Sequence, residues 1–168
     1  LACPDRTVVS LMGDGGFGMA HSEIGTAVQY GINTVCIVMN NGCYGLTKGQ
    51  DSATADQGSA SKKGDANPFG AIDLCGTALQ MGATFVARSF SGDKEQLVPL
   101  IKAAMSHRGF ALIDVISPCV TFNNTPASTK SYEFVRQHAE ATGTVDFVPM
   151  RQEITTRSRP GAAYEVTM

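Results

Sequence analysis

Residues 7–16, TVVSLMGDGG, run from an apolar, β-branched segment straight into a glycine-rich turn. Such a run predicts a buried strand over residues 7–12 that ends in a tight turn. Apolar positions at helical spacing follow over residues 20–30, Gly31 is placed to end that helix, and residues 34–39 form a second apolar run. The order of strand, helix and strand predicts a βαβ unit with two parallel strands.

The same alternation continues along the chain. Helices are predicted at residues 69–81, 94–106 and 131–141, and strands at residues 83–87 and 110–116. Strands that alternate with helices predict an α/β fold with a doubly wound, mostly parallel sheet. A long loop rich in Gly, Ser, Ala, Asp and Lys interrupts the pattern at residues 42–68, and loops of this length are usually functional or mobile.

The predicted domain organisation is one α/β domain over residues 1–123 and a C-terminal extension or tail over residues 124–168. The chain has 168 residues, enough for one core. Residues 143–168 lack clear periodicity, so we expect the extension to pack on the domain or on a partner subunit. The first residue is not Met and the chain enters a strand almost at once, which predicts a piece of a longer protein.

The composition excludes several classes of protein. A formal charge of −2 gives no reason to expect nucleic acid as a partner, and no apolar run is long enough to cross a membrane. Five irregularly spaced cysteines without a CxxC pair argue against a disulfide framework. Reduced thiols and the lack of a visible secretory signal predict a cytoplasmic location.

The chemistry begins at the turn after the first strand. Gly13, Gly15 and Gly18 have the G-x-G-x-x-G spacing of a dinucleotide site, but Asp14 would direct a negative charge at a bound pyrophosphate. A divalent cation between the carboxylate and the phosphates resolves this conflict, and Mg²⁺ bridges such groups readily. Asn40-Asn41 end the neighbouring strand, so parallel pairing places a neutral oxygen ligand beside Asp14.

Gly13-Asp14-Gly15, then 24 residues, then Asn40-Asn41 resembles the thiamine-diphosphate motif GDG…NN. The resemblance implies the pyrophosphate-type domain of that family. It also implies that Asp14, Asn41 and the backbone carbonyl of Cys43 hold Mg²⁺ on the diphosphate of the cofactor. The implied cofactor-binding residues are Gly13, Asp14, Gly15, Gly16, Asn41, Cys43, Tyr44, Gly45 and Leu46.

Three further segments resemble the β subunit of 2-oxoacid:ferredoxin oxidoreductases, in particular the 2-oxoglutarate type. They are YGLTKGQDSATADQG (44–58), residues 82–104, and GFALIDVISPCVTFN (109–123). The resemblance covers about residues 5–140. It implies oxidative decarboxylation of a 2-oxoacid to an acyl-coenzyme A, with electrons passed to ferredoxin and an α subunit that completes the site. Lys48 and Thr47 are then expected in the active-site loop, with Lys48 near the substrate carboxylate.

Cys119, in the sequence SPC, matches the fourth cysteine that holds a [4Fe–4S] cluster in these β subunits. The other three cluster cysteines have no matching positions in this chain. Four thiolates are needed to hold such a cluster, so we expect it only in the complete protein.

Two other functions stay open. Gly16 stands where the β subunits usually carry another Asp, and the helix that follows is similar to that of acetolactate synthase. This favours a non-oxidative thiamine-diphosphate carboligase or decarboxylase, whereas LTKGQ (46–50) and SPC (117–119) argue against it. A Rossmann-type nucleotide-binding module is the other alternative, but it leaves Asn40-Asn41 unexplained.

Overall fold

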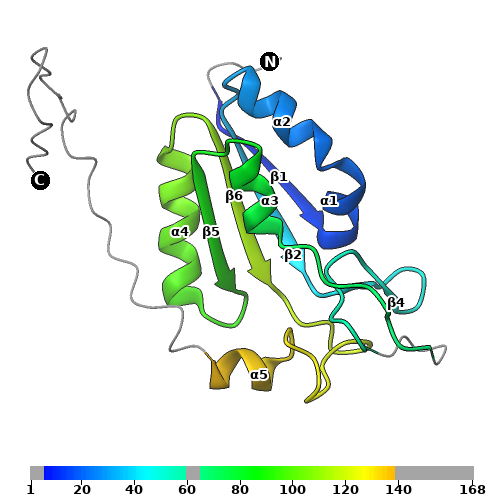
Figure 1. Cartoon of the computed structure of the whole chain (residues 1–168). Helices are drawn as coiled ribbons and strands as arrows, with labels where there is room; N and C mark the ends of the chain where they lie inside the picture. The colour runs from blue at the N-terminus through cyan, green and yellow to red at the C-terminus, as the bar shows by residue number, and fades with distance from the viewer. Residues whose placement is uncertain (1–5, 60–64, 139–168) are drawn as a thin grey trace, which may run out of the picture.

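A computed structural model describes residues 6–59 and 65–138 (Figure 1). The helices and strands, in chain order, are β1 (Val8–Gly13), α1 (Asp14–Ala20), α2 (Ser22–Gln29), β2 (Thr34–Asn40), β3 (Cys43–Tyr44), β4 (Gln50–Asp51), α3 (Leu74–Gln80), β5 (Phe85–Phe90), α4 (Lys94–Ser106), β6 (Phe110–Ile116) and α5 (Tyr132–Gln137).

The main sheet has four parallel strands in the order β1-β2-β6-β5. Gly13 pairs with Met39 and Asn40 pairs with Ile116, so β1, β2 and β6 end at the same edge of the sheet. The predicted βαβ unit is confirmed by the parallel pairing of β1 with β2. β3 and β4 form a separate antiparallel hairpin beyond that edge.

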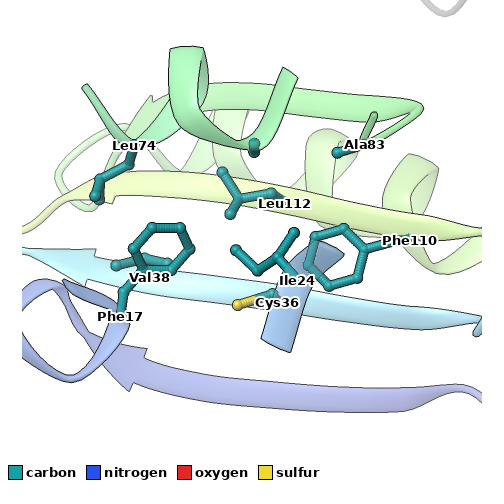
Figure 2. Close-up of a cluster of buried hydrophobic side chains, with 9 residues drawn as sticks. Phe17, Ile24, Cys36, Val38, Leu74, Ala83, Phe110 and Leu112 are labelled. Carbon is teal, nitrogen blue, oxygen red and sulfur yellow. The ribbon is translucent and has the colours of Figure 1, made fainter. Parts of the chain in front are cut away.

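Alternate residues of the central strands face two separate apolar cores. α1, α2 and α3 cover one face, and α4 covers the other. The first core, drawn in Figure 2, contains Phe17, Ile24, Cys36, Val38, Leu74, Ala78, Ala83, Phe110 and Leu112. The second contains Val35, Ile37, Ala104, Ala111, Ile113 and Val115. Helices on both faces of a parallel sheet confirm the predicted doubly wound α/β fold.

The helix predicted at residues 69–81 begins only at Leu74. Asp73 caps its first turn, because the Asp73 side chain accepts a hydrogen bond from the backbone N–H of Cys75. Before the cap, Phe69 and Ile72 are 74% and 50% exposed, so this segment has no apolar face to bury. The helix ends as predicted, at Gly82 in a left-handed conformation (φ +88°).

Two short helices, the first of which starts at Asp14, replace the single helix predicted at residues 20–30. α1 begins at Asp14, directly after β1, and α2 follows at Ser22. His21 separates them: its side-chain Nδ1 lies 3.0 Å from the carbonyl oxygen of Gly18, and its own carbonyl accepts from the N–H of Ile24. The connection between β1 and β2 therefore consists of two short helices that meet at His21.

The remaining boundaries differ little from the prediction. The strand predicted at residues 83–87 is shifted to Phe85–Phe90, because its pairing with β6 starts with Phe85 opposite Ala111. α4 and β6 have the predicted bounds. Of the helix predicted at residues 131–141, α5 occupies Tyr132–Gln137.

Residues 124–138 lie against the loops beyond the carboxyl edge of the sheet. Lys130 and Thr129 bind Asp56, and the Tyr132 ring packs edge-on against Phe90 at 5.6 Å. The predicted tail at residues 143–168 lies outside the described residues, and the domain boundary at residue 123 stays a prediction. Within the described part of the chain, no helix is both long enough and apolar enough to span a membrane.

Leu112 is fully buried in the first core, so its truncation should destabilise the whole domain. We expect Leu112→Ala to lower the free energy of unfolding by about 2–5 kcal/mol, since it removes buried methyl groups and leaves a cavity. Leu46→Ala is the matched control, because Leu46 is 99% exposed, and it should change stability by less than about 0.5 kcal/mol. Urea unfolding measures both; equal effects would contradict the assigned core.

Candidate functional site

Asp14 is the polar centre of the carboxyl edge of the sheet. It follows β1 directly and opens α1, and it is only 1% exposed. Its Oδ2 accepts hydrogen bonds from the backbone N–H of Gly42 at 3.1 Å, from the hydroxyl of Thr54 at 2.5 Å and from the hydroxyl of Ser52. Three donors on one oxygen fix the orientation of this carboxylate.

A chain of polar contacts leads from Asp14 into the sheet. The Thr54 hydroxyl lies 2.8 Å from Asn40 Oδ1, and Asn40 Nδ2 donates to Asp114 Oδ1 at 3.0 Å. Arg88 Nε then donates to Asp114 Oδ2 at 2.8 Å, and Arg88 Nη2 reaches Asp73 at 2.8 Å. Asp114 is fully buried in β6, and burial raises its pKa although Arg88 and Asn40 favour the carboxylate.

The turn after β2 wraps around the Asp14 carboxylate. Asn41 Oδ1 accepts the backbone N–H of Cys43 at 2.9 Å, and the carbonyl of Asn41 accepts from Asn123 Nδ2 at 2.7 Å. Gly42 has a φ of +72°, and a Cβ there would lie 2.7 Å from Asn123 Nδ2. Only glycine satisfies both the conformation and the space at this position.

The predicted active-site loop, which carries Thr47 and Lys48, begins with an exposed tight turn from Tyr44 to Gly49. Leu46 is 99% exposed, and the N–H of Gly49 bonds to the carbonyl of Tyr44. Lys48 is the sole non-glycine with a positive φ (+73°) in residues 6–59 and 65–138, so the loop holds it in an unfavourable conformation. The Tyr44 ring occupies the space where a Cβ at Gly15 would stand.

Thr47 and Gly45 belong to the same turn. The Thr47 hydroxyl lies 3.4 Å from the carbonyl of Tyr44, and the carbonyl of Gly45 accepts from the N–H of Lys48. At the start of α1, a Cβ added to Gly13 or Gly16 would meet no atom within 4 Å, so there is open space next to these two glycines. Of the predicted cofactor-binding residues, Gly13, Gly15 and Gly16 are next to Asp14 in the chain and the Tyr44 ring lies against Gly15, whereas Leu46 is in the exposed turn.

Cys119 lies beside Cys43. Burial first, and then the neighbouring Cys119 thiol, raise the pKa of Cys43 to about 12, so Cys43 is a neutral thiol at physiological pH. Both are free cysteines. Within the described residues, no three His, Cys, Asp or Glu side chains group so that they could hold a metal ion, so Cys119 has no set of further cluster ligands there.

Lys130 and Asp56 form a largely buried ion pair that joins the segment after β6 to the long loop. Their ion pair measures 2.9 Å, and the two side chains are 8% and 19% exposed. Burial by itself would raise the pKa of Asp56. The hydrogen bonds from Thr129 and Lys130 and the charge of Lys130 oppose this and hold it below the ordinary value of 3.8.

The donors at this edge suit a hard divalent cation. The possible donors are the carboxylate of Asp14, the amide oxygen of Asn41 and the backbone carbonyl of Cys43. The hydrogen bond from Gly42 to Asp14 holds the two segments that carry them together. In the described part of the chain, Asp14 Oδ1 has no hydrogen bond, and every fully enclosed side-chain oxygen there has a partner. Oδ1 therefore still reaches solvent and is available as a ligand. Mg²⁺ takes oxygen ligands of these kinds.

Ser52, Thr54 and Asp114 were missed by the sequence reasoning. Ser52 and Thr54 lie in a polar, small-residue loop whose composition resembles that of many exposed loops. Asp114 gave a usable signal, because a single carboxylate inside the apolar strand FALIDVI must be buried and must find a partner. Asn40 was predicted only as part of the Asn40-Asn41 pair, and no partner was predicted for it. In the structure its side chain donates to Asp114 of the neighbouring strand β6.

The known family that matches this chain is the thiamine pyrophosphate enzymes, through their C-terminal TPP-binding domain, which matches residues 1–115. The matched region contains β1, β2 and almost all of β6, together with Asp14, Asn41 and Thr54.

Individual relatives are similar over most of this chain. It is 41% identical, over 74% of its length, to a 2-oxoacid:ferredoxin oxidoreductase subunit beta from Sulfolobus sp. It is 40% identical, over 73% of its length, to the 2-oxoglutarate synthase subunit KorB from Methanocaldococcus jannaschii. These matches cover 41% and 46% of the two relatives, so the chain spans less than half of their length.

One solved structure is similar in fold and in sequence. It is a 2-oxoglutarate:ferredoxin oxidoreductase from Magnetococcus marinus with 2-oxoglutarate, coenzyme A and succinyl-CoA bound. The similarity has a TM-score of 0.68 and 30% sequence identity, and it covers 87% of this chain and 48% of that one.

The Asp56–Lys130 pair predicts a pH dependence of stability. Because the pKa of Asp56 is lower in the folded than in the unfolded protein, its stabilising effect is present above 3.8 and is lost as the pH falls through the folded value. We expect Asp56→Asn to lower the free energy of unfolding by about 1–3 kcal/mol at neutral pH, and the deficit to shrink in acid. Urea unfolding across this pH range measures it.

Asp65→Asn provides the control, since Asp65 is an exposed carboxylate in the segment just before α3. It should follow the unsubstituted protein at every pH. A deficit of Asp56→Asn that stays constant into acid would contradict the lowered pKa of Asp56.

Proposed function

Because the chain belongs to the thiamine pyrophosphate enzymes and forms their C-terminal TPP-binding domain, we propose that it is the cofactor-binding portion of a 2-oxoacid:ferredoxin oxidoreductase β subunit. The reaction proposed for the whole enzyme is oxidative decarboxylation of a 2-oxoacid, with 2-oxoglutarate as the leading substrate, to an acyl-coenzyme A. Electrons pass to ferredoxin. The observation that carries the proposal is the buried carboxylate of Asp14, bonded to the turn that follows Asn40-Asn41.

Magnesium is the proposed link between this chain and the diphosphate. Asp14, Asn41 and the carbonyl of Cys43 are its proposed ligands. The support is chemical: an available carboxylate oxygen, an amide oxygen and a backbone carbonyl from two neighbouring segments form a hard donor set. Gly13 and Gly16 have open space where a side chain would otherwise stand, which leaves room for a ligand to approach the backbone there.

Thiamine diphosphate, when bound, supplies the electron sink that decarboxylation of a 2-oxoacid needs. The residues of this chain bind and orient it. The hairpin of β3 and β4 lies beyond the carboxyl edge of the sheet (Figure 1), and we propose that its loop, from Tyr44 to Lys48, covers the bound cofactor. Lys48 is exposed there, and we assign to its ammonium group the binding of the substrate carboxylate, with Thr47 beside it.

The remaining parts of the proposed enzyme lie outside this chain. An α subunit is the proposed source of the pyrimidine-side domain, and coenzyme A and ferredoxin are the proposed acceptors of the acyl group and of the electrons. Cys119 is the proposed fourth ligand of a [4Fe–4S] cluster whose other ligands come from elsewhere in the complete protein. The Magnetococcus enzyme, with 2-oxoglutarate and coenzyme A bound, supports this choice of substrates.

The metal assignment is tested by calorimetric titration of thiamine diphosphate into the full-length protein with and without Mg²⁺. Binding should require Mg²⁺, and Asp14→Asn should weaken it at least about tenfold, because the amide cannot supply the negative charge. Asp93→Asn, the same change at the start of α4, is the control and should bind as the unsubstituted protein does. Metal-independent binding, or an unaffected Asp14→Asn protein, would contradict the proposal.

The substrate assignment predicts a separate effect at Lys48. Lys48→Met should raise the KM for 2-oxoglutarate by about ten- to a hundredfold, the loss expected for a charge-assisted hydrogen bond of about 1.5–3 kcal/mol. Lys102→Met, an exposed position on α4, should leave KM unchanged. Reduction of ferredoxin by the holoenzyme measures both. Formation of a carboligation product without ferredoxin reduction would favour the non-oxidative alternative.

A further inference from the structure

The tight turn from Tyr44 to Gly49 meets the segment after β6 at its last residue. Residues 45–48 are exposed, whereas Gly49 is buried. A Cβ built on Gly49 would lie 2.8 Å from Cγ and from Cδ1 of Phe122, and 3.0 Å from the Phe122 Cβ. The Phe122 side chain therefore packs directly on the Gly49 backbone, and this packing attaches the exposed turn to the domain.

The residue before Gly49 has a conformation that needs such support. Lys48 has a φ of +73°, in the left-handed region, and Gly49 follows with +87°. Glycine adopts this region freely, but a lysine there is strained, because its Cβ comes too close to the backbone. Strain of this kind persists only where the surroundings hold the backbone in place.

Two kinds of contact hold the backbone at Lys48. Inside the turn, the N–H of Lys48 donates to the carbonyl of Gly45 at 3.1 Å. The N–H of Gly49 donates to the carbonyl of Tyr44 at 2.9 Å. Both bonds lie within the turn, so they move with it, and the packing of Phe122 on Gly49 adds a contact from outside.

The segment that carries Phe122 is itself fixed. The carbonyl of Cys119 accepts from the N–H groups of Phe122, at 3.2 Å, and of Asn123, at 2.9 Å, which closes a tight turn. The side-chain amide of Asn123 then donates to the carbonyl of Asn41 at 2.7 Å, directly after β2. Through these bonds Phe122 is held at the end of the sheet, and its ring gives the exposed turn a fixed support.

We propose that Phe122 is a positioning residue for substrate binding. Its contact with Gly49 holds Lys48 in the left-handed conformation from which the ammonium group reaches the carboxylate of a bound 2-oxoacid. This inference rests on the proposed function, which gives Lys48 that role. Phe122 acts through the turn and needs no contact with substrate or cofactor.

The expected effect follows from the population of the binding conformation. The rotamers open to a side chain depend on its backbone angles, so a turn that leaves the left-handed region at Lys48 redirects the ammonium group. Truncation of Phe122 removes the packing on Gly49 and lets the strained turn relax. If only a fraction of the molecules keeps the binding conformation, the apparent affinity for substrate falls in proportion to that fraction, whereas bound substrate reacts as before.

The test is ferredoxin reduction by the holoenzyme with 2-oxoglutarate. Phe122→Ala should raise the KM about three- to tenfold and change kcat by less than about twofold. Phe122→Leu keeps Cβ, Cγ and Cδ1, the three atoms nearest Gly49, and should restore the KM. Phe134→Ala is the matched control, because Phe134 is also half-buried but stacks on His138 after α5, and it should leave the KM unchanged.

A double substitution separates positioning from a general structural role. If Phe122 acts through Lys48, Phe122→Ala should add nothing in the Lys48→Met background, where no ammonium group is left to position. Glutarate has two carboxylates but lacks the 2-oxo group, so it supplies a readout without turnover. Its Kd for the holoenzyme, measured by calorimetry, should rise in Phe122→Ala by the same factor as the KM.

Gly49→Ala replaces Phe122→Ala if that protein does not fold. It keeps Phe122 and breaks the same contact from the other side, since the new Cβ would enter the space of the ring. It should raise the KM in the same way, and this rise should also vanish in the Lys48→Met background.

An unchanged KM in Phe122→Ala, or a rise that persists in full in the Lys48→Met background, would overturn the positioning role. If Lys48→Met raises the KM while Phe122→Ala behaves as the unsubstituted protein, only this inference fails. If Lys48→Met itself leaves the KM unchanged, the substrate role of Lys48 in the proposed function fails, and this inference fails with it.

Discussion

The buried carboxylate of Asp14 is the constraint on which the arrangement of this edge of the sheet depends. A carboxylate that is 1% exposed must have its hydrogen-bonding capacity met by the protein or by an ion. Gly42 meets part of it from the turn after β2, and Ser52 and Thr54 meet part of it from the segment after β4. One side chain thus fixes two loops that the strands alone would leave unconnected.

A second buried carboxylate, Asp114, extends this polar region into the sheet. It occupies the next position after Leu112 on the same face of β6, so the first apolar core ends where the polar chain begins. Arg88 and Asn40 compensate for its burial from the strands on either side. The sheet face that α1, α2 and α3 cover therefore has two parts. Its apolar part stabilises the domain, and its polar part, at the carboxyl edge, holds the candidate site.

The segment after β6 keeps the loops of the site in place. Asn123 donates to the carbonyl of Asn41. The Phe122 ring lies against Gly49 and leaves no room for a Cβ there, and Gly49 also has a left-handed conformation (φ +87°). Lys130 binds Asp56 in the long loop. Asn123, the last residue of the predicted α/β domain, is thus in direct contact with the turn around Asp14.

The sequence by itself determined the alternation of strands and helices, the parallel sheet and the pair of motifs around Asp14 and Asn41, but it did not predict the β3–β4 hairpin within residues 42–68. These follow from local periodicity, from glycine conformations and from the rule that parallel strands end at one edge, all of which are properties of short segments. Helix starts were less well predicted, because caps such as Asp73 act through single side chains.

Only the tertiary structure decided what surrounds Asp14. Thr54 is 40 positions further along the chain and Asp114 is 74 positions beyond Asn40, and no local pattern links residues at such separations. Asn40 and Asn41 are adjacent in sequence, yet one points into the sheet and the other caps a turn. Their different roles arise because successive residues at the end of a strand face opposite directions, and only the packed sheet shows which direction holds the partner.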